Sequence, residues 1–265
     1  MDWLHIVVLS LLQGITEFLP VSSSAHLILP SQLFGWPDQG LAFDVAVHVG
    51  TLLAVLIAFR HEVVTTAGGW LRHVFKQEAS AESRLGWAVI IGTIPAALVG
   101  YLLEDAIELY TRSALVIATS TIVFGLVLWW ADAKGSRAVD MDRLDWKAAL
   151  FIGCAQALAL IPGTSRSGIT ITAALLLGFT RQSAARFSFL LSIPLILAAG
   201  TLKTVELVQT GAEAQWVDIA WGIGLSFVSA VLCIKLFLAA LDKIGMLPFV
   251  IYRLVLGVVL FALFL

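Results

Sequence analysis

Residues 13 to 27 decide the fold, and they read Gln13-Gly-Ile-Thr-Glu-Phe-Leu-Pro-Val-Ser-Ser-Ser-Ala-His-Leu27. We expect an apolar helix that runs in from Trp3 to end at Pro20, because proline removes a backbone donor and clashes with the preceding turn. Gln13 and Glu17 lie four residues apart before this break, so they share one face of the helix. The serines that follow the proline are natural N-caps for a second helix. The stretch therefore gathers a carboxylate, an imidazole and several hydroxyl groups at a break in an apolar segment.

The composition is that of a membrane protein. Of the 265 residues, 60% are hydrophobic and 13% are charged, whereas soluble domains carry about 25% charged residues. Cys154 and Cys233 both lie in apolar runs, so we predict neither a disulfide nor a metal cluster. The start, Met1-Asp2-Trp3, lacks the basic residues and the cleavage pattern of a signal peptide, so we expect the N-terminal helix to be retained.

Six apolar stretches are long enough to cross about 30 Å of hydrocarbon at about 1.5 Å per residue. They lie near 43–59, 86–103, 113–131, 186–203, 217–241 and 248–265. Two further apolar stretches, 3–34 and 146–178, are interrupted by polar residues and proline. We interpret these two as re-entrant helix–break–helix hairpins. The sequence thus predicts an all-α polytopic membrane protein with one domain, 1–265, which consists of repeat 1 (1–131), a cytoplasmic linker (132–145) and repeat 2 (146–265).

The two repeats are expected to have inverted topology. Each contains one hairpin and three spans, and an odd number of spans turns the second half upside down. If the N-terminus is outside, most of the 16 basic residues lie in the inside loops 60–85, 132–147, 179–186 and 242–247. The outside loops then hold only two basic residues, Arg112 and Lys203, beside Glu104, Asp105, Glu108, Glu206 and Glu213. We therefore predict that both termini face outward, and that Lys235 and Arg253 snorkel from the inner ends of their spans.

The second break reads Pro162-Gly-Thr-Ser-Arg-Ser-Gly-Ile-Thr170. A guanidinium in mid-segment is costly and needs a partner, so Arg166 is a functional candidate. Its planar fork of donors matches phosphate oxygens, and the N-terminus of the following helix is a ready anion site. If both breaks meet, they form a pocket for phosphate chemistry on a substrate that arrives from the lipid. The expected members of this pocket are Gln13, Glu17, Ser22, Ser23, Ser24, His26, Ser165, Arg166, Ser167 and Thr170.

Each of these residues also has a structural interpretation. A run of serines can serve helix packing, His26 can be a satisfied core histidine, and Arg166 can form a structural salt bridge with Glu17. A purely structural scaffold would leave the buried Glu17 and Arg166 without a reason. The alternative from another functional class is a lipid-carrier flippase or a small-anion transporter, because broken helices in inverted repeats are typical of transporters. The concentration of Glu, Ser, His and Arg favours catalysis, since it exceeds what binding alone needs.

At these residues the chain resembles the undecaprenyl-diphosphate phosphatase family, the integral-membrane type linked to bacitracin resistance. The segment from Gln13 to His26 is similar to the first signature of that family, and the segment from Pro162 to Thr170 is similar to the second. The resemblance implies hydrolysis of undecaprenyl diphosphate to undecaprenyl phosphate and inorganic phosphate, which recycles the lipid carrier for peptidoglycan and other envelope polymers. It also implies a bacterial inner-membrane location, a pocket open to the periplasm, and a divalent cation, Mg²⁺ or Ca²⁺. Many members carry glutamate at the position of Gln13, and a neutral amide is a poorer metal ligand.

These arguments assign roles to the residues of the pocket. Arg166 is predicted to hold the diphosphate and to stabilise charge on the transferring phosphoryl group. Glu17 is predicted to bind the metal or to polarise the nucleophile. We favour Ser23 activated by His26 as the nucleophile, with a phosphohistidine route through His26 as the rival and water as a third choice. Substrate contacts are expected from Gln13, Ser22, Ser24, Gly163, Ser165, Ser167 and Thr170. The expected partner is the polyprenyl diphosphate lipid and no nucleic acid, and a homodimer is a candidate assembly.

Overall fold

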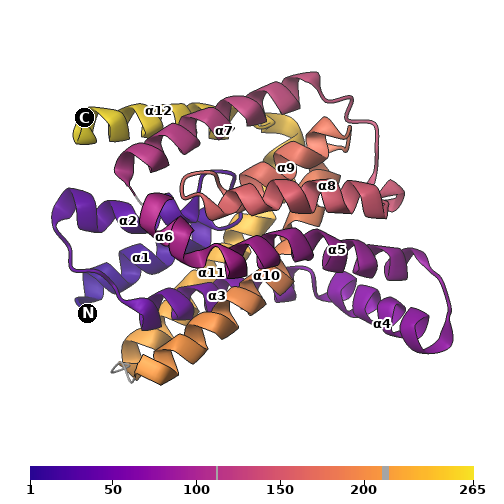
Figure 1. Ribbon diagram of the computed structural model, residues 1–265, viewed down its shortest axis with the longest axis horizontal. Coiled ribbons are helices and arrows are strands. Elements are labelled where there is room, and N and C mark those ends of the chain that lie inside the picture. Colours follow the sequence, from indigo (N-terminus) through magenta and orange to yellow (C-terminus); the bar gives the residue numbers. More distant parts are fainter. Residues whose placement is uncertain (112, 211–214) are drawn as a thin grey trace.

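The computed structural model describes residues 1–111, 113–210 and 215–265. The described part is built from helices, and both termini lie at the left of Figure 1, while the turn between the fourth and fifth helices projects at the right. Two residues that we assigned to outside loops, Arg112 and Glu213, lie outside the described residues.

The first half of the chain begins with two short helices that are separated by a break, α1 (Trp3–Thr16) and α2 (Ser23–Phe34). They are followed by α3 (Leu41–Ala58), α4 (Arg60–Lys76), α5 (Ala81–Leu102), α6 (Glu104–Thr111) and α7 (Ala114–Lys134). A short connection with the 3₁₀ turn η1 (Met141–Arg143) leads to the second broken segment, which comprises α8 (Trp146–Ala157), the 3₁₀ turn η2 (Leu158–Leu160) and α9 (Arg166–Leu176). The chain ends with α10 (Arg181–Thr210), α11 (Trp216–Ile244) and α12 (Leu247–Phe264).

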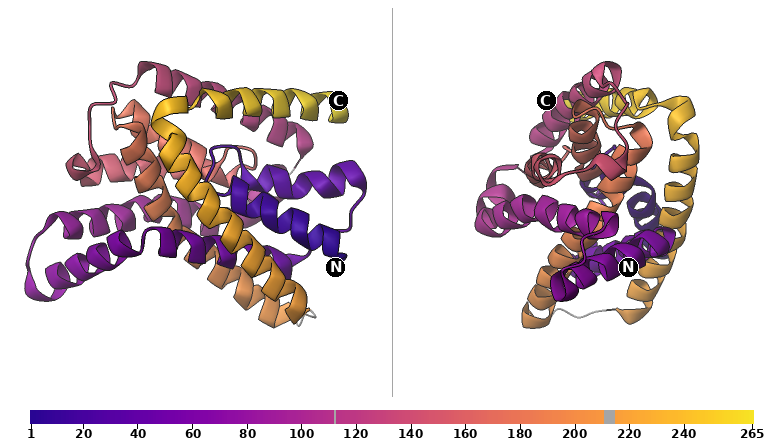
Figure 2. Two further views of the ribbon diagram at one scale, coloured as in Figure 1. Left: turned by 180° about the vertical axis from the view of Figure 1, so that it is seen from behind. Right: turned by 90° about the vertical axis from the view of Figure 1, so that its right-hand side faces the viewer.

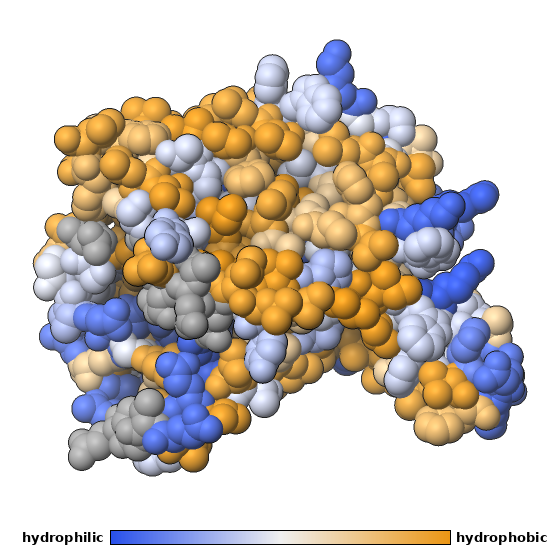
Figure 3. Space-filling model, viewed as in Figure 1, coloured by the Kyte–Doolittle hydropathy of each residue, from blue (hydrophilic) through white to orange (hydrophobic). Residues whose placement is uncertain are grey.

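The predicted spans are confirmed. Among the described residues, six helices are long and apolar enough to cross a membrane, namely α3, α5, α7, α10, α11 and α12. Only 22% to 44% of each apolar window in these helices is buried inside the protein, so more than half of each window is at least partly exposed. In Figure 3 hydrophobic side chains cover the middle of the visible face, between hydrophilic patches at the right and at the lower left. The surface is that of a multi-pass membrane protein.

Three local predictions were wrong. The stretch 60–85, predicted as a loop, contains all of α4 and the start of α5, and α6 likewise lies in a predicted loop. In α4 charged residues interrupt the apolar positions, as in helices that lie along an interface, so the helix contains no long apolar run. The helix α1 ends at Thr16 rather than at Pro20, and Glu17 is its C-cap. The proline therefore lies inside the break and does not end the helix itself.

The two halves of the chain are interleaved. The helix α1 packs against α11, α8 packs against α5, and α7 packs against α12; Figure 2 shows α7 and α12 side by side along one edge. Glycines allow the closest approaches to α11, because an added Cβ would lie 1.9 Å from Ser229 Oγ at Gly14 and 2.0 Å from Ser226 Oγ at Gly50. Each broken segment is thus held mainly by spans of the other half. The inverted orientation of the two repeats stays a prediction.

Candidate active site

The first break is a turn over residues 17 to 21, between α1 and α2. Ser22 occupies the N-cap position of α2, as predicted, but with φ 75° and without a capping hydrogen bond from its side chain. Its hydroxyl lies 3.2 Å from that of Ser24 instead. A left-handed backbone is uncommon for serine and persists only where the surroundings enforce it. The break is therefore held from outside rather than by its own capping.

The second break covers residues 161 to 165 and has the same form. Ser165 is the N-cap of α9 with φ 71°, and its hydroxyl accepts a hydrogen bond from the Gly168 backbone at 3.1 Å. Two hydroxyls of α7 hold the turn: Ser120 donates to the carbonyl of Pro162 at 2.5 Å, and Thr121 donates to that of Gly163 at 3.3 Å. A Cβ at Gly163 would lie 2.2 Å from Ser120 Oγ. Gly163 therefore allows the close approach of the break to α7.

The two breaks meet, as the sequence predicted. Arg166 at the start of α9 donates through Nη2 to Glu17 Oε1 at 2.9 Å, and through Nη1 to the Ser188 carbonyl of α10 at 3.1 Å. Ser167 Oγ donates to the carbonyl of Leu19 at 2.8 Å. The ring of Phe18 lies 5.9 Å from Arg166 Cζ. Residues about 150 positions apart in the chain thus form one site.

Glu17 is the centre of this site. Its Oε2 accepts hydrogen bonds from Ser23 Oγ at 2.7 Å and from Gln13 Nε2 at 3.0 Å, while its Oε1 faces Arg166. A carboxylate that accepts the proton of a serine hydroxyl can act as the base that activates it.

His26 makes different contacts from those we predicted. Its Nδ1 lies 2.6 Å from the carbonyl of Ser22, and its Nε2 lies 2.5 Å from the hydroxyl of Tyr252 on α12. A carbonyl only accepts, so Nδ1 carries the proton of the neutral ring, and Nε2 accepts from the tyrosine. Ser23 is hydrogen-bonded to Glu17 rather than to His26. The predicted Ser23–His26 pair was wrong, because the imidazole turns toward α12.

Exposure separates the groups that a substrate can reach from those that support them. Ser24 is exposed, and Ser23 and Arg166 are partly exposed. The other predicted members are buried, namely Gln13, Glu17, Ser22, His26, Gly163, Ser165, Ser167 and Thr170. Thr170 Oγ1 bonds to the Arg166 carbonyl at 2.9 Å and to Ser188 Oγ at 2.7 Å. Ser165, Ser167 and Thr170, predicted as substrate contacts, therefore use their hydroxyls to fix α9 and Arg166.

Arg253 is the residue that the sequence analysis misjudged most. Predicted to snorkel, it is instead 0% exposed and lies beneath both breaks. Nη1 donates to the carbonyls of Pro20 (3.3 Å) and Thr164 (2.9 Å), Nη2 to those of Gly163 (3.0 Å) and Ser120 (3.5 Å), and Nε to that of Thr121 (3.1 Å). One guanidinium thus binds the first break, the second break and α7. No local pattern on α12 indicates this role.

The oxygen atoms of the site can be compared with those that bind divalent cations. No group of three His, Cys, Asp or Glu side chains gathers within the described residues. Mg²⁺, however, is commonly held by one or two carboxylates together with the phosphates of a substrate. Beside Glu17, the amide oxygen of Gln13 is buried and has no hydrogen-bond partner in the part of the chain that the structure describes. The two oxygen donors fit a cation that is shared with a phosphorylated substrate.

Known proteins resemble this chain over nearly its whole length. The family model described as "Bacitracin resistance protein BacA" matches residues 6–259. The undecaprenyl-diphosphatase of Chromohalobacter salexigens is 67% identical over 260 residues, which are 98% of this chain and 98% of that protein. Undecaprenyl-diphosphatase 1 of Pseudoalteromonas translucida is 60% identical over 258 residues (97% of each chain), and the undecaprenyl-diphosphatase of Hahella chejuensis is 62% identical over 258 residues (97% of this chain and 96% of that protein).

Proposed function

Because the chain belongs to the bacitracin resistance protein BacA family, we infer that it hydrolyses undecaprenyl diphosphate to undecaprenyl phosphate and inorganic phosphate. The observation that carries this function is the contact of Glu17 with both Ser23 and Arg166, where the two breaks meet. A base, a hydroxyl nucleophile and a phosphate-binding guanidinium are the groups that phosphoryl transfer needs. The flippase or transporter alternative is not favoured, since the relatives at 60% to 67% identity are named as diphosphatases.

The reaction begins with Ser23. As its oxygen attacks the terminal phosphorus, Glu17 takes the hydroxyl proton, the bond to the bridging oxygen breaks, and the proton passes to the departing lipid phosphate. In the second step Glu17 takes a proton from water, which attacks the phosphoserine, and returns it to the Ser23 oxygen as phosphate leaves. Arg166 binds the anionic phosphoryl oxygens throughout and stabilises the charge that they share in the transition state. The first backbone N–H groups of α2 and α9 lack intrahelical acceptors and add to this field.

His26 has a supporting role in this mechanism. Both of its ring nitrogens are hydrogen-bonded, to Ser22 and to Tyr252, so neither is free to attack phosphorus or to deprotonate Ser23. A divalent cation bound by Glu17 and the Gln13 amide would neutralise charge on the diphosphate. The phosphohistidine route through His26 is the rival mechanism, and identification of the phosphorylated residue distinguishes it from attack by Ser23.

The proposal also includes a location. We place the chain in the bacterial inner membrane, with both termini and the opening of the site toward the periplasm. Two observations support this orientation: both termini lie at one end of the molecule (Figure 1), and the basic residues concentrate in the connections at the other end. A homodimer remains a candidate assembly.

The test is phosphate release from a C55 or C15 prenyl diphosphate by the purified protein in detergent, with Mg²⁺ or Ca²⁺ and then with EDTA. We expect cation-dependent release that is lost in Ser23→Ala and Arg166→Ala but kept in Ser31→Ala, a serine of α2 whose hydroxyl donates to the Ile28 carbonyl of the same helix at 2.8 Å. Absence of release by the folded wild-type protein would overturn the phosphatase and favour the transporter.

Substrate labelled at its terminal phosphate identifies the nucleophile. Label that survives an acid quench on Ser23 supports the serine route, because phosphohistidine is lost in acid. Label on His26 after an alkaline quench would overturn it. Turnover that leaves no label after either quench, and that Ser23→Ala does not impair, would favour direct attack by water.

A further inference from the structure

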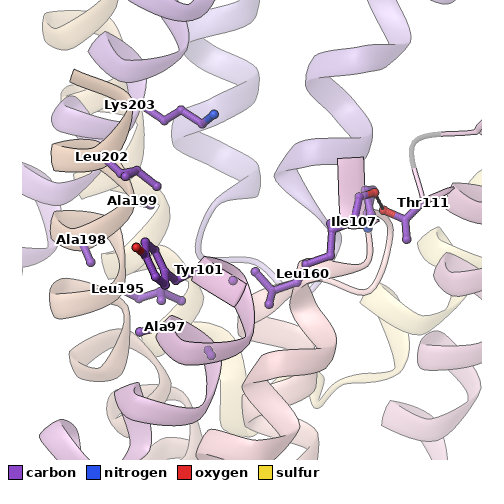
Figure 4. Close-up of a pocket in the computed structure, with 13 residues that line it drawn as sticks. Ala97, Tyr101, Ile107, Thr111, Leu160, Leu195, Ala198, Ala199, Leu202 and Lys203 are labelled. Atoms are coloured by element: carbon purple, nitrogen blue, oxygen red, sulfur yellow. Dashed lines mark hydrogen bonds between the residues drawn. The ribbon is translucent and has the colours of Figure 1, made fainter. Parts of the chain in front are cut away.

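A cavity of about 420 Å³ lies between α5, α6, η2 and α10 (Figure 4). Its wall is almost wholly apolar and contains many small residues, among them Ala97 and Gly100 of α5 and Ala198 and Ala199 of α10. Lys203 lies at the end remote from Ala97 in Figure 4. The active site described above does not include this cavity.

The cavity adjoins the active site at the second break. Leu160, the last residue of η2, and Pro162, near the start of the turn that leads to Arg166, form part of its wall. On α10 the active site and the cavity share one helix face, because Ser188, which accepts from Arg166, is seven residues before Leu195 of the wall. The distance along the helix is about 10 Å. A chain that leaves the diphosphate site along this face would enter the cavity.

The cavity also opens outward. Its wall changes from the buried Ala96 to Tyr101, which is 74% exposed, and Leu202, which is 44% exposed. These exposed side chains belong to α5 and α10, two of the helices that are apolar enough to cross the membrane. The contact between α3 and α11 is closed by comparison, since a Cβ at Gly50 would collide with Ser226. The gap between α5 and α10 is thus an apolar path from the site toward the lipid.

We propose that this cavity is the binding site for the isoprene units nearest the diphosphate of the lipid substrate. The proposal rests on the proposed function, which places the diphosphate at Arg166. A polyprenyl chain offers methyl-branched apolar surface and no hydrogen-bonding groups, and the small residues of the wall leave room for those branches. An acyl chain of a membrane phospholipid is the competing occupant, and the experiments distinguish it.

The first experiment fills the cavity. The variant Gly100→Leu places a branched side chain beside Leu160, where an added Cβ would lie 3.5 Å away without a clash. The matched control is Gly200→Leu on α10, where an added Cβ meets no described atom within 4 Å. We expect Gly100→Leu to lower kcat/KM for C15 and C55 prenyl diphosphates about tenfold, the effect of displacing one or two buried aliphatic groups. Hydrolysis of dimethylallyl diphosphate, whose C5 chain is too short to fill the cavity, should stay as in the control. Equal values for the two variants with the C15 substrate would overturn the proposal.

The second experiment does not depend on turnover. A C15 diphosphate with a photoreactive group on its first isoprene units should label peptides of α10 between Leu195 and Lys203, and excess unlabelled C15 diphosphate should prevent this labelling. Labelling confined to α2 or α12, or labelling of α10 that only phospholipid prevents, would overturn the proposal. Specific labelling of α10 by a protein that releases no phosphate would keep the binding site and reject the phosphatase.

Discussion

Replacing Arg253 by lysine keeps the positive charge beneath the two breaks but removes the fork that spans them. The guanidinium reaches five backbone carbonyls, those of Pro20, Ser120, Thr121, Gly163 and Thr164, at 2.9 to 3.5 Å. A lysine ammonium has three donors at a single point. It cannot reach the first break, the second break and α7 together. We therefore expect Arg253→Lys to loosen the contact between the breaks.

The size of the effect follows from the carbonyls that depend on Arg253. Ser120 and Thr121 lie within α7, where helical hydrogen bonds also serve their carbonyls, and Gly163 keeps its bond from Thr121. The carbonyls of Pro20 and Thr164 are the ones at risk. A buried acceptor without a partner costs about 1–3 kcal/mol, so the loss of both bonds should lower the free energy of unfolding by about 2–6 kcal/mol. That is a large part of the typical 5–15 kcal/mol.

Thermal unfolding in detergent and phosphate release from the C15 substrate measure the two consequences. Displacement of the breaks by about 1 Å should lower kcat about a hundredfold, because reacting groups must be held closely. The control is Arg60→Lys, which should change stability by less than about 0.5 kcal/mol, because the exposed Arg60 guanidinium makes one long hydrogen bond among the described residues, to the Ile57 carbonyl at 3.4 Å. If Arg253→Lys unfolds and turns over as Arg60→Lys does, the proposed role of Arg253 is wrong.

Three further changes test other contacts. Gly14→Ala should lower the free energy of unfolding by about 1–3 kcal/mol, because the added methyl group collides with α11. The measurement is the unfolding temperature in detergent, and Gly224→Ala, whose added methyl group meets no described atom within 4 Å, should leave it unchanged. Tyr252→Phe removes the hydroxyl partner of His26 and should lower turnover less than about tenfold. If Tyr252→Phe loses as much turnover as Ser23→Ala does, His26 takes part in catalysis. Asp132→Asn weakens a bidentate ion pair with α10 and should lower stability by about 1–3 kcal/mol while phosphate release per folded protein is unchanged.

The spans could be predicted because a membrane segment depends on local composition. Errors arose at their ends, where charged residues stopped the prediction too early. The span predicted at 186–203 belongs to α10, which begins at Arg181. Arg181 pairs with Asp132, and Arg186 pairs with Glu62. Ion pairs with residues far away in the sequence thus allow charged residues to be part of the helix. A short window of sequence does not contain these partners, so it cannot predict them.

The members of the candidate site could be predicted where a charged group inside the membrane has a high free-energy cost. An arginine at this depth requires a partner, and the salt bridge with Glu17, which we gave as the structural interpretation of Arg166, is present in the structure. Which hydroxyl faces which base depends on the geometry of the breaks. The expected partner of Ser23 was His26, three positions along the same helix, but the hydrogen bond goes to Glu17. Tyr252 and Ser188 could not be foreseen, because they come from spans without a local signal.

The two breaks explain why the site is built from both halves of the chain. Inside the hydrocarbon, backbone groups released from a helix have no water to bind and must find partners in the protein. The carbonyl of Leu19 is served by Ser167, and that of Pro20 by Arg253. The carbonyl of Pro162 is served in turn by Ser120 of α7. The Val21 N–H also donates to the Leu19 carbonyl from within the first break, at 2.8 Å, but the bonds from Ser167, Arg253 and Ser120 all come from the other half of the chain. Each break is therefore stabilised by packing of the other half against it. The packing that satisfies the broken backbone is also the packing that brings Glu17, Ser23 and Arg166 together, and assembly of the active site is therefore part of folding the whole chain.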